Sequence, residues 1–143
     1  MSTVKIKADR YELLPYYATD KAVGMDLKSS VNDHIMPGDI RIVPTGVYIE
    51  LPHDMEAQIR SRSGLAAKGI IVANSPGTID PDYRGEIKVI LLNVSKEAFY
   101  FSKEDRIAQI VFAPFIQVEL KVVTELSDTI RGDGGFGHTG ING

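Results

Sequence analysis

The amino-acid sequence predicts an all-β sandwich or barrel. Most of the chain consists of short runs in which apolar and polar residues alternate, the pattern of strands that bury one face. Glycine and proline separate these runs at regular intervals, and only one short stretch has the character of a helical turn. With 143 residues, 43% of them hydrophobic and 24% charged, the chain is long enough for one domain with a substantial core.

Strand patterns follow one another along almost the whole chain. Residues 37–39 and 44–46 are expected to be turns because proline and glycine interrupt a long apolar region there. Pro114 is expected to end one strand. The predicted strands are residues 4–7, 22–27, short runs within 35–51, 56–60, 85–94, 98–101, 106–112 and 118–126.

The composition argues against several classes of function. A net charge of −3 provides no basic field for nucleic acid or anionic lipid, so we expect no stable nucleic-acid partner. No apolar run is long enough to span a membrane or to act as a signal peptide, so no membrane association is expected. Cysteine is absent, which rules out disulfides and thiolate chemistry. Together these features favour a soluble, intracellular protein of the cytoplasm, in which local arginines, backbone amides or a metal would hold any anionic ligand.

Residues 65–68 form the best candidate for a helical turn. Ser63 fits an N-cap and Gly69 a C-terminal stop. Unpaired amides at a helix N-terminus favour anions, and Arg62 stands beside this one. An ordinary capped helix without a ligand is the alternative interpretation.

The segment 74–86 contains prolines, glycines, aspartates and a tyrosine, which is too much punctuation for a helix or a central strand. Pro81 favours an extended backbone at Asp80 and leaves residues 82–83 to form a tight turn. We therefore predict a β-hairpin that carries Asp80 on one arm and Tyr83 near its tip. The alternative is an ordinary surface hairpin with hydrated carboxylates.

Two other features invite a functional interpretation. Gln109 lies on an otherwise apolar strand face, so it is either a buried polar group with partners or a side chain that points into a site. Residues 131–140 are too rich in glycine to order themselves, and they form either a frayed end or a flap that a ligand orders. No P-loop, dinucleotide-binding, zinc-protease or nucleophile-elbow motif is present, and the three histidines lack the spacing of metal ligands.

Five segments, taken together, resemble the trimeric dUTP pyrophosphatase (dUTPase) family. Each segment alone is a weak signal, but all five occur in the family's order, and the resemblance spans nearly the whole chain. The segments are Ala22-Val23-Gly24-Met25-Asp26-Leu27, Arg62-Ser63-Gly64-Leu65-Ala66, residues 74–86, Arg106-Ile107-Ala108-Gln109, and Arg131-Gly132-Asp133-Gly134-Gly135-Phe136-Gly137-His138-Thr139-Gly140.

The resemblance implies a jelly-roll-like β-barrel in a homotrimer whose active sites lie between subunits. Residues 1–130 would form the barrel, with one short helix, and residues 131–143 a flexible arm that closes a neighbouring subunit's site. The implied reaction is hydrolysis of dUTP to dUMP and pyrophosphate. Asp80 would be the general base that activates a water for attack at the α-phosphorus. Such an activity would remove dUTP from the nucleotide pool and supply dUMP for dTTP synthesis.

The family's substrate contacts carry over to matching positions of this sequence. Asn74 would bind the uracil edge with help from main-chain groups that include Gly77, and Phe136 of the arm would stack on the base. Tyr83 would pack against the deoxyribose and exclude UTP. Mg²⁺ would bridge the triphosphate, and Asp26 would hold the ion through water. The remaining contacts to the phosphates would come from Arg62, Ser63, Gly64, Gln109, Arg131 and Gly137.

Two positions of the arm depart from the family's usual pattern. His138 stands where a small hydroxyl residue is usual, which affects one contact to the γ-phosphate. Asp133 adds a negative charge, and we expect its side chain to face water.

Two other functions compete with dUTP hydrolysis. One is dCTP deaminase, a relative of the same fold that usually has a tryptophan where this chain has Tyr83 and that needs a glutamate acid/base, for which Glu86 is the candidate. The other is a catalytically silent β-barrel that binds or regulates.

Overall fold

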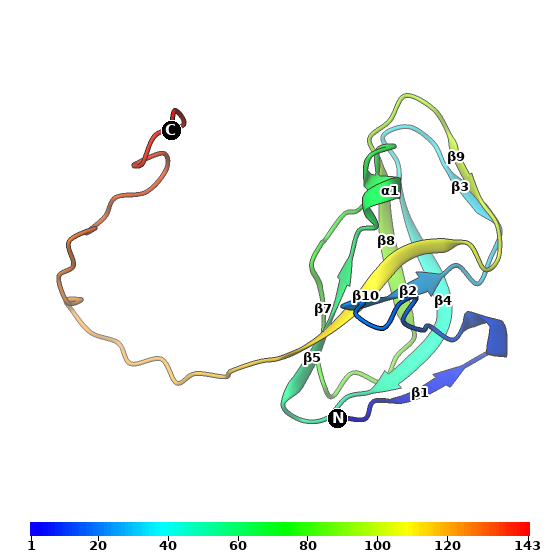
Figure 1. Cartoon of the computed structure of the whole chain (residues 1–143), viewed down its shortest axis with the longest axis horizontal. Coiled ribbons are helices and arrows are strands. Elements are labelled where there is room, and N and C mark those ends of the chain that lie inside the picture. The colour runs from blue at the N-terminus through cyan, green and yellow to red at the C-terminus, as the bar shows by residue number, and fades with distance from the viewer.

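Two four-stranded antiparallel sheets and a two-stranded ribbon form the body of the structure, a computed structural model that describes residues 1–143 (Figure 1). The elements are β1 (Lys5–Ala8), η1 (Tyr11–Leu13), β2 (Gly24–Lys28), β3 (Asp33–Ile35), β4 (Ile40–Glu50), β5 (Met55–Arg60), α1 (Ser63–Ala66), β6 (Ile70–Val72), β7 (Gly77–Ile79), β8 (Ile87–Asn93), β9 (Phe99–Phe101) and β10 (Arg106–Pro114). The strand orders are β1-β4-β8-β6 and β2-β10-β5-β7, and β3 pairs with β9. The prediction of an all-β, jelly-roll-like fold with one short helix is confirmed. No helix has the length and hydropathy needed to cross a bilayer.

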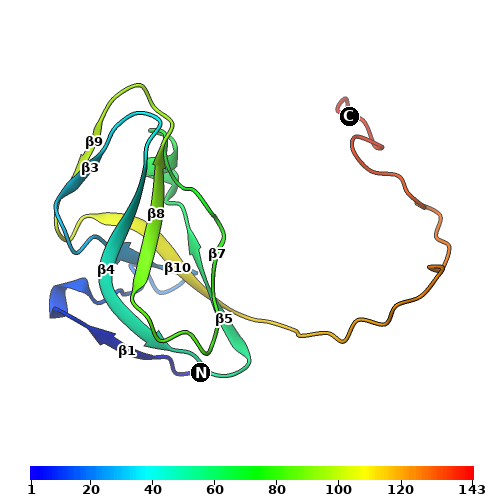
Figure 2. The same cartoon turned by 180° about the vertical axis from the view of Figure 1, so that it is seen from behind.

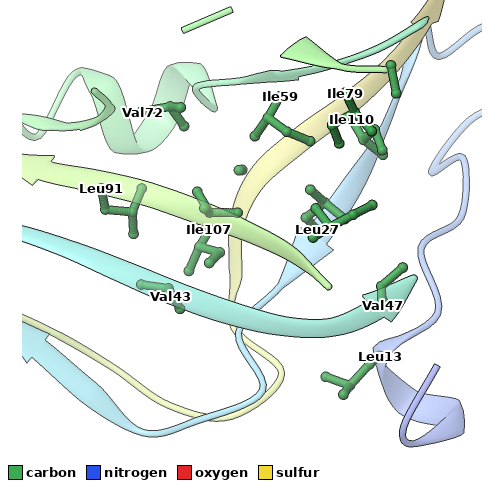
Figure 3. Packing of buried hydrophobic residues seen from close by; sticks show 14 of the residues in the cluster. Leu13, Leu27, Val43, Val47, Ile59, Val72, Ile79, Leu91, Ile107 and Ile110 are labelled. Atoms are coloured by element: carbon green, nitrogen blue, oxygen red, sulfur yellow. The ribbon is translucent and has the colours of Figure 1, made fainter. Parts of the chain in front are cut away.

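The two sheets share one hydrophobic core (Figure 3). In β8, Ile87, Val89 and Leu91 are buried and alternate with more exposed residues, which is the period of two expected from the sequence. From the other sheet, Leu27 of β2 and Ile110 of β10 enter the same cluster. Alternation along the strands therefore determines which side chains fill the barrel.

The outer face of the β1-β4-β8-β6 sheet is apolar as well. Ile40 pairs with Leu92 and Ile42 with Ile90 across β4 and β8, and Ile71 of β6 lies opposite Leu92. Ile40 and Ile42 are 59% and 60% exposed in the single chain. Strands that are apolar on both faces are typical of sheets covered on both sides, so this face lacks a cover in the single chain.

Residues 44–46, which were expected to be a turn, lie within β4 as a bulge. The register between β4 and β8 shifts between Pro44 and Val47. Gly46 has φ +68°, a left-handed conformation that glycine adopts without strain. The prediction was wrong because proline and glycine mark bulges as well as turns, and the pairing with β8 continues on both sides of this one.

The segment 74–86 is not a hairpin. Its first arm, β7, pairs with β5, whereas β8 pairs with β4 and β6, so the segment crosses from one sheet to the other. The Tyr83 N–H donates to the Asp80 carbonyl at 3.1 Å. That bond places Pro81 and Asp82 at the centre of the turn, one residue earlier than predicted. Local sequence placed the turn to within one residue but did not reveal the distant partner of each arm.

The chain leaves the sheets after Pro114, the last residue of β10, as the sequence predicted. Residues 118–126 form no strand, and the prediction of one there was wrong. Val118, Leu120 and Val122 do alternate with polar residues, but all three are at least 72% exposed and pair with nothing in their own chain. Figures 1 and 2 show this segment running away from the barrel toward the C-terminus.

Replacing Leu27 with alanine should lower the free energy of unfolding by about 2–5 kcal/mol. Leu27 is completely buried, so the truncation leaves a cavity in the shared core. Thermal unfolding followed by circular dichroism measures the effect, and Val23→Ala, at a position 71% exposed, is the control. Equal unfolding midpoints for the two variants would contradict this description of the core.

Candidate active site

The segment between β7 and β8 lines a cavity of about 280 Å³. Asn74, Gly77, Asp80 and Tyr83 all contribute to its wall, together with isoleucines of β4, β5 and β8. Asp80 directly follows β7, is exposed, and is linked to Tyr83 by the turn hydrogen bond. Apolar and polar residues line this cavity in equal number, and small-molecule sites combine both kinds of surface. The predicted base therefore shares one cavity with three of the predicted nucleoside contacts, Asn74, Gly77 and Tyr83.

Gly77 allows the Asn74 side chain to lie close to the backbone. A Cβ atom at position 77 would lie 3.1 Å from Asn74 Nδ2 and 3.4 Å from Ile59 Cβ. Gly77 itself is buried at the start of β7. A larger residue would therefore push the Asn74 amide outward, and the glycine is needed for the shape of the cavity.

The Tyr83 side chain is held against its own loop. Its hydroxyl donates to the Glu86 carbonyl at 2.8 Å, and its ring lies so close to Gly85 that a Cβ atom there would collide with ring carbons and hydroxyl. The Tyr83 side chain as a whole stays 45% exposed. The ring thus has a fixed position while part of its surface is available for contact with a ligand.

A second group of polar side chains gathers around Asp26 of β2. Its Oδ1 atom lies 3.1 Å from Arg62 Nε, and its Oδ2 atom lies 3.9 Å from Arg106 Nη1. Arg62 Nη1 also donates to the Arg106 carbonyl at 3.0 Å. The Asp26 side chain is 25% exposed. One carboxylate thus offsets part of the charge of two guanidinium groups.

Gln109 joins this group from β10. It pairs with Asp26 on one side and with Arg60 on the other, and its Nε2 donates to the Ser61 carbonyl at 3.0 Å. A Cβ atom at Gly24 would lie 2.6 Å from Gln109 Oε1. The glutamine is therefore a half-buried group with a partner, held in place by the absence of a side chain at Gly24.

The short helix begins two residues earlier than predicted, at Ser63–Ala66 rather than at residues 65–68, and its cap differs as well. Arg62 is its N-cap residue, with an extended backbone, and Ser63 is the first helical residue rather than the cap. Ser63 and Gly64 are exposed on the first turn. Gly69 has φ +86° just after the helix, as predicted for a C-terminal stop. Because α1 has only four residues, its dipole is weak, and any anion binding would depend on Arg62 and on exposed amides.

The arm residues lie apart from both groups. Arg131 Nε donates to the Gly134 carbonyl at 2.8 Å within a turn. Phe136 is fully exposed, and Gly137 has φ +90°. Figures 1 and 2 show that this end of the chain does not fold back onto its own barrel.

The predicted site residues therefore fall into three groups. Asn74, Gly77, Asp80 and Tyr83 share the cavity. Asp26, Arg62 and Gln109, with Ser63 and Gly64 nearby in sequence, lie around β2, β10 and α1 and do not line that cavity. Arg131, Phe136 and Gly137 lie on the arm. A single chain assembles the first two groups separately and does not bring the arm to either.

A family model described as dUTPase matches residues 10–140, nearly the whole chain. The chain belongs to the dUTPase family.

Curated relatives resemble this chain over nearly their full length. A deoxyuridine 5'-triphosphate nucleotidohydrolase of Nautilia profundicola is 55% identical over 135 residues, covering 94% of this chain and 95% of the relative. One of Rickettsia bellii is 52% identical over 147 residues, covering 99% and 97%.

Solved dUTPase structures share the fold. A dUTPase of Staphylococcus bacteriophage 80alpha, determined with dUpNHpp, has a TM-score of 0.90 at 23% identity and covers 99% of this chain and 100% of its own. A dUTPase of phage phi11 of S. aureus, described with a structural Mg(II) ion, has a TM-score of 0.79 at 20% identity, covering 87% and 98%.

The donor set of this dUTPase-family chain fits a metal ion that the protein holds only indirectly. No group of three or more histidine or carboxylate side chains is arranged to chelate a metal. Asp26 is a single carboxylate already paired with two arginines. Such a residue suits hydrogen bonds to the water shell of Mg²⁺, an ion that keeps several waters and binds phosphate oxygens. Asp26 alone would not hold a metal without a ligand.

Two residues of the site, Arg106 and Glu86, were not predicted to take part in dUTP hydrolysis, and Glu86 was considered only as the acid/base of the competing deaminase. Arg106 contacts Asp26. The sequence feature that could have indicated Arg106 is its position at the start of the strand that carries Gln109. Glu86 accepts a hydrogen bond from the Gly46 N–H at 2.9 Å, a contact across forty residues that no local pattern reveals. The Arg106 side chain contacts Asp26, which the sequence did single out, whereas the Glu86 carboxylate holds the backbone of the β4 bulge.

Proposed function

We propose that this chain hydrolyses dUTP to dUMP and pyrophosphate, with Asp80 as the general base. The observation that supports this most directly is the exposed Asp80 carboxylate at the wall of the cavity that Asn74, Gly77 and Tyr83 also line. A carboxylate within hydrogen-bond reach of a water can take its proton as the water attacks the α-phosphorus. The dUMP produced would serve dTTP synthesis, and the reaction would keep dUTP out of the nucleotide pool.

The nucleoside would occupy the cavity beside Asp80. The Asn74 amide offers both a donor and an acceptor to the uracil edge, and backbone groups near Gly77 would add to this recognition. Tyr83 would lie against the deoxyribose, where a 2′-hydroxyl would collide with the ring.

The triphosphate would be bound by the second group of residues. Four kinds of donor are available for the phosphates on one side of the barrel. They are the Arg62 guanidinium, the Ser63 hydroxyl, the Gly64 backbone amide and the Gln109 side-chain amide. Mg²⁺ would supply charge neutralisation and a bridge between phosphate oxygens when bound. Asp26 would then hold the waters of that ion, and Arg62 would turn partly from Asp26 toward phosphate.

The proposed working unit is a homotrimer. The three groups of site residues lie apart in one chain, so a neighbour must complete each site. The exposed apolar face around Ile40, Ile42 and Ile90 supplies a surface that another copy would cover. We therefore expect the nucleoside cavity of one subunit to meet the phosphate-binding group of the next.

The arm would reach a further subunit. β1 is an edge strand, and beside it lies an apolar groove of about 400 Å³ lined by Val4, Ile6, Met25 and Phe112, among others. Residues 116–122 of another copy have the alternating apolar side chains to fill such a groove as an added strand. Their attachment would bring residues 131–143 to a neighbouring site, where Phe136 would stack on uracil and where Arg131 and the Gly137 amide would contact phosphates.

Deamination of dCTP is the competing function of the same fold. It would need Glu86 as an acid/base, but the Glu86 Oε1 atom accepts the Gly46 N–H at 2.9 Å and is committed to that bond. The presence of Tyr83 and of the glycine-rich arm also favours pyrophosphate release.

The substrate is tested by offering dUTP, dCTP, UTP and dTTP with Mg²⁺ and measuring pyrophosphate and ammonia. We expect dUTP to yield pyrophosphate. We expect the other three nucleotides to yield pyrophosphate and ammonia much more slowly. Ammonia from dCTP would favour the deaminase, and no product from any nucleotide would favour a catalytically silent binding module.

Asp80→Asn should reduce the turnover of dUTP by roughly 10²-fold or more while dUTP still binds. The amide keeps the size of the side chain but cannot accept the proton of the attacking water. Steady-state kinetics and calorimetric binding measure the two effects. Asp82→Asn, an exposed carboxylate two residues away that does not line the nucleoside cavity, is the matched control and should keep near-normal turnover. Near-normal turnover of the Asp80 variant would remove this residue from the mechanism.

Deleting the chain after Ile130 should leave a folded trimer that has lost most of its turnover. The deletion removes Arg131 and Phe136 but leaves the barrel, the apolar outer face and residues 116–122 intact, and closure of a site orients the substrate and excludes water. Phe136→Ala should lose less, because a stacked base is worth on the order of 1–3 kcal/mol. Sedimentation and dUTP kinetics check both statements. Full activity of the truncated protein would mean that the arm is only a frayed end.

A further inference from the structure

Two hydrogen bonds join the β4 bulge to Glu86, the last residue of the segment 74–86, and to Ile87, the first residue of β8. The Thr45 hydroxyl donates to the Ile87 carbonyl at 2.5 Å, and the Gly46 N–H donates to Glu86 Oε1 at 2.9 Å. Thr45 and Gly46 are both buried. Because these groups are removed from water, each bond has no ready substitute.

The bulge cannot shift easily away from Glu86. A Cβ atom at Gly46 would lie 2.7 Å from Leu13 Cδ1 and 3.4 Å from Asp9 Oδ2, so both residues pack closely against Gly46. Leu13 is 1% exposed. Partial burial raises the pKa of the nearby Tyr48 phenol, and the charges of Asp9, Glu86 and Tyr83 raise it further. The phenol therefore stays neutral at neutral pH. The Gly46 N–H thus has a fixed place in a packed environment.

Glu86 connects this fixed point to Tyr83. Its carboxylate holds the Gly46 N–H, and its own carbonyl accepts the Tyr83 hydroxyl at 2.8 Å. The Tyr83 ring packs against Gly85, the residue just before Glu86. A movement of Glu86 would therefore carry the Tyr83 ring with it.

We propose that Glu86 is a positioning residue for sugar selection. By fixing the Tyr83 ring relative to β4, it sets how closely the ring approaches C2′ of the bound nucleotide, and so determines the rejection of a 2′-hydroxyl. This inference rests on the proposed function, because it assigns a cause to the selectivity of that same site. The proposed role requires a side-chain oxygen at position 86 that accepts a hydrogen bond. It does not require the negative charge of Glu86, since a neutral amide oxygen can also accept the Gly46 N–H.

The experiment compares kcat/KM for dUTP with that for UTP in three variants. Glu86→Ala removes the acceptor and should lower the dUTP:UTP ratio about tenfold or more, mainly through faster UTP hydrolysis, because a small displacement of a positioning group has large kinetic effects. Glu86→Gln should restore most of the ratio. Glu50→Ala, an exposed glutamate of the same β4 strand that pairs only with Lys5, should leave the ratio unchanged.

A fourth variant keeps the test decisive if Glu86→Ala does not fold. Tyr83→Phe keeps the ring and the bulge but removes the bond to the Glu86 carbonyl, and it should also lower the ratio. If folded Glu86→Ala, or Tyr83→Phe in its place, keeps the wild-type ratio, the inference is wrong. If the wild-type chain does not hydrolyse dUTP at all, the proposed function has failed instead, so the two failures are distinguishable.

Discussion

The antiparallel pairing of β4 with β8 is the constraint on which the rest of the structure depends. Its inner row, with Val43 opposite Val89, packs into the shared core, and its outer row, with Ile42 opposite Ile90, forms the exposed apolar face. β8 begins directly after the segment that carries Asp80 and Tyr83. A register error of one residue would exchange the two rows, and it would displace the proposed active site at the same time.

Local patterns in the sequence predicted the strands but not the partners of those strands. The predicted bounds of β5, β8 and β10 agree with the structure to within two residues at each end. In β5 and β8 alternate residues are buried, whereas β10 also buries neighbouring residues. The bulge at residues 44–46 resembled a turn because proline and glycine serve both structures. Residues 74–86 resembled a hairpin because nothing local to β7 shows that it pairs with β5. Residues 118–126 have the alternation of a strand, and the single chain offers them no partner.

The same limit applies to the candidate site. Asp80, Tyr83, Asn74 and Gly77 lie in one stretch of sequence, so their shared cavity could be expected from it. The ion pair of Arg62 with Asp26 joins the N-cap of α1 to β2, and the hydrogen bond of Glu86 with Gly46 joins the segment before β8 to β4. Contacts of this kind depend on the completed fold. The sequence supplied the groups that would touch a substrate, whereas the structure supplied those that hold them in place.

Charge explains why a site of this kind would be divided among subunits. The chain has a net charge of −3, and Asp26 partly neutralises the arginines nearest the proposed phosphate site. A triphosphate would therefore meet arginines whose charge is partly offset in one subunit, and a cation and an additional arginine would strengthen its binding. In the proposed trimer, Mg²⁺ would supply part of the missing positive charge when bound, and Arg131 of another copy's arm would supply the rest. Strong binding would then require the nucleotide, the metal and the closed arm together. An open site would hold inorganic anions poorly, and the arm would be free to release pyrophosphate once the bond to the α-phosphorus is broken.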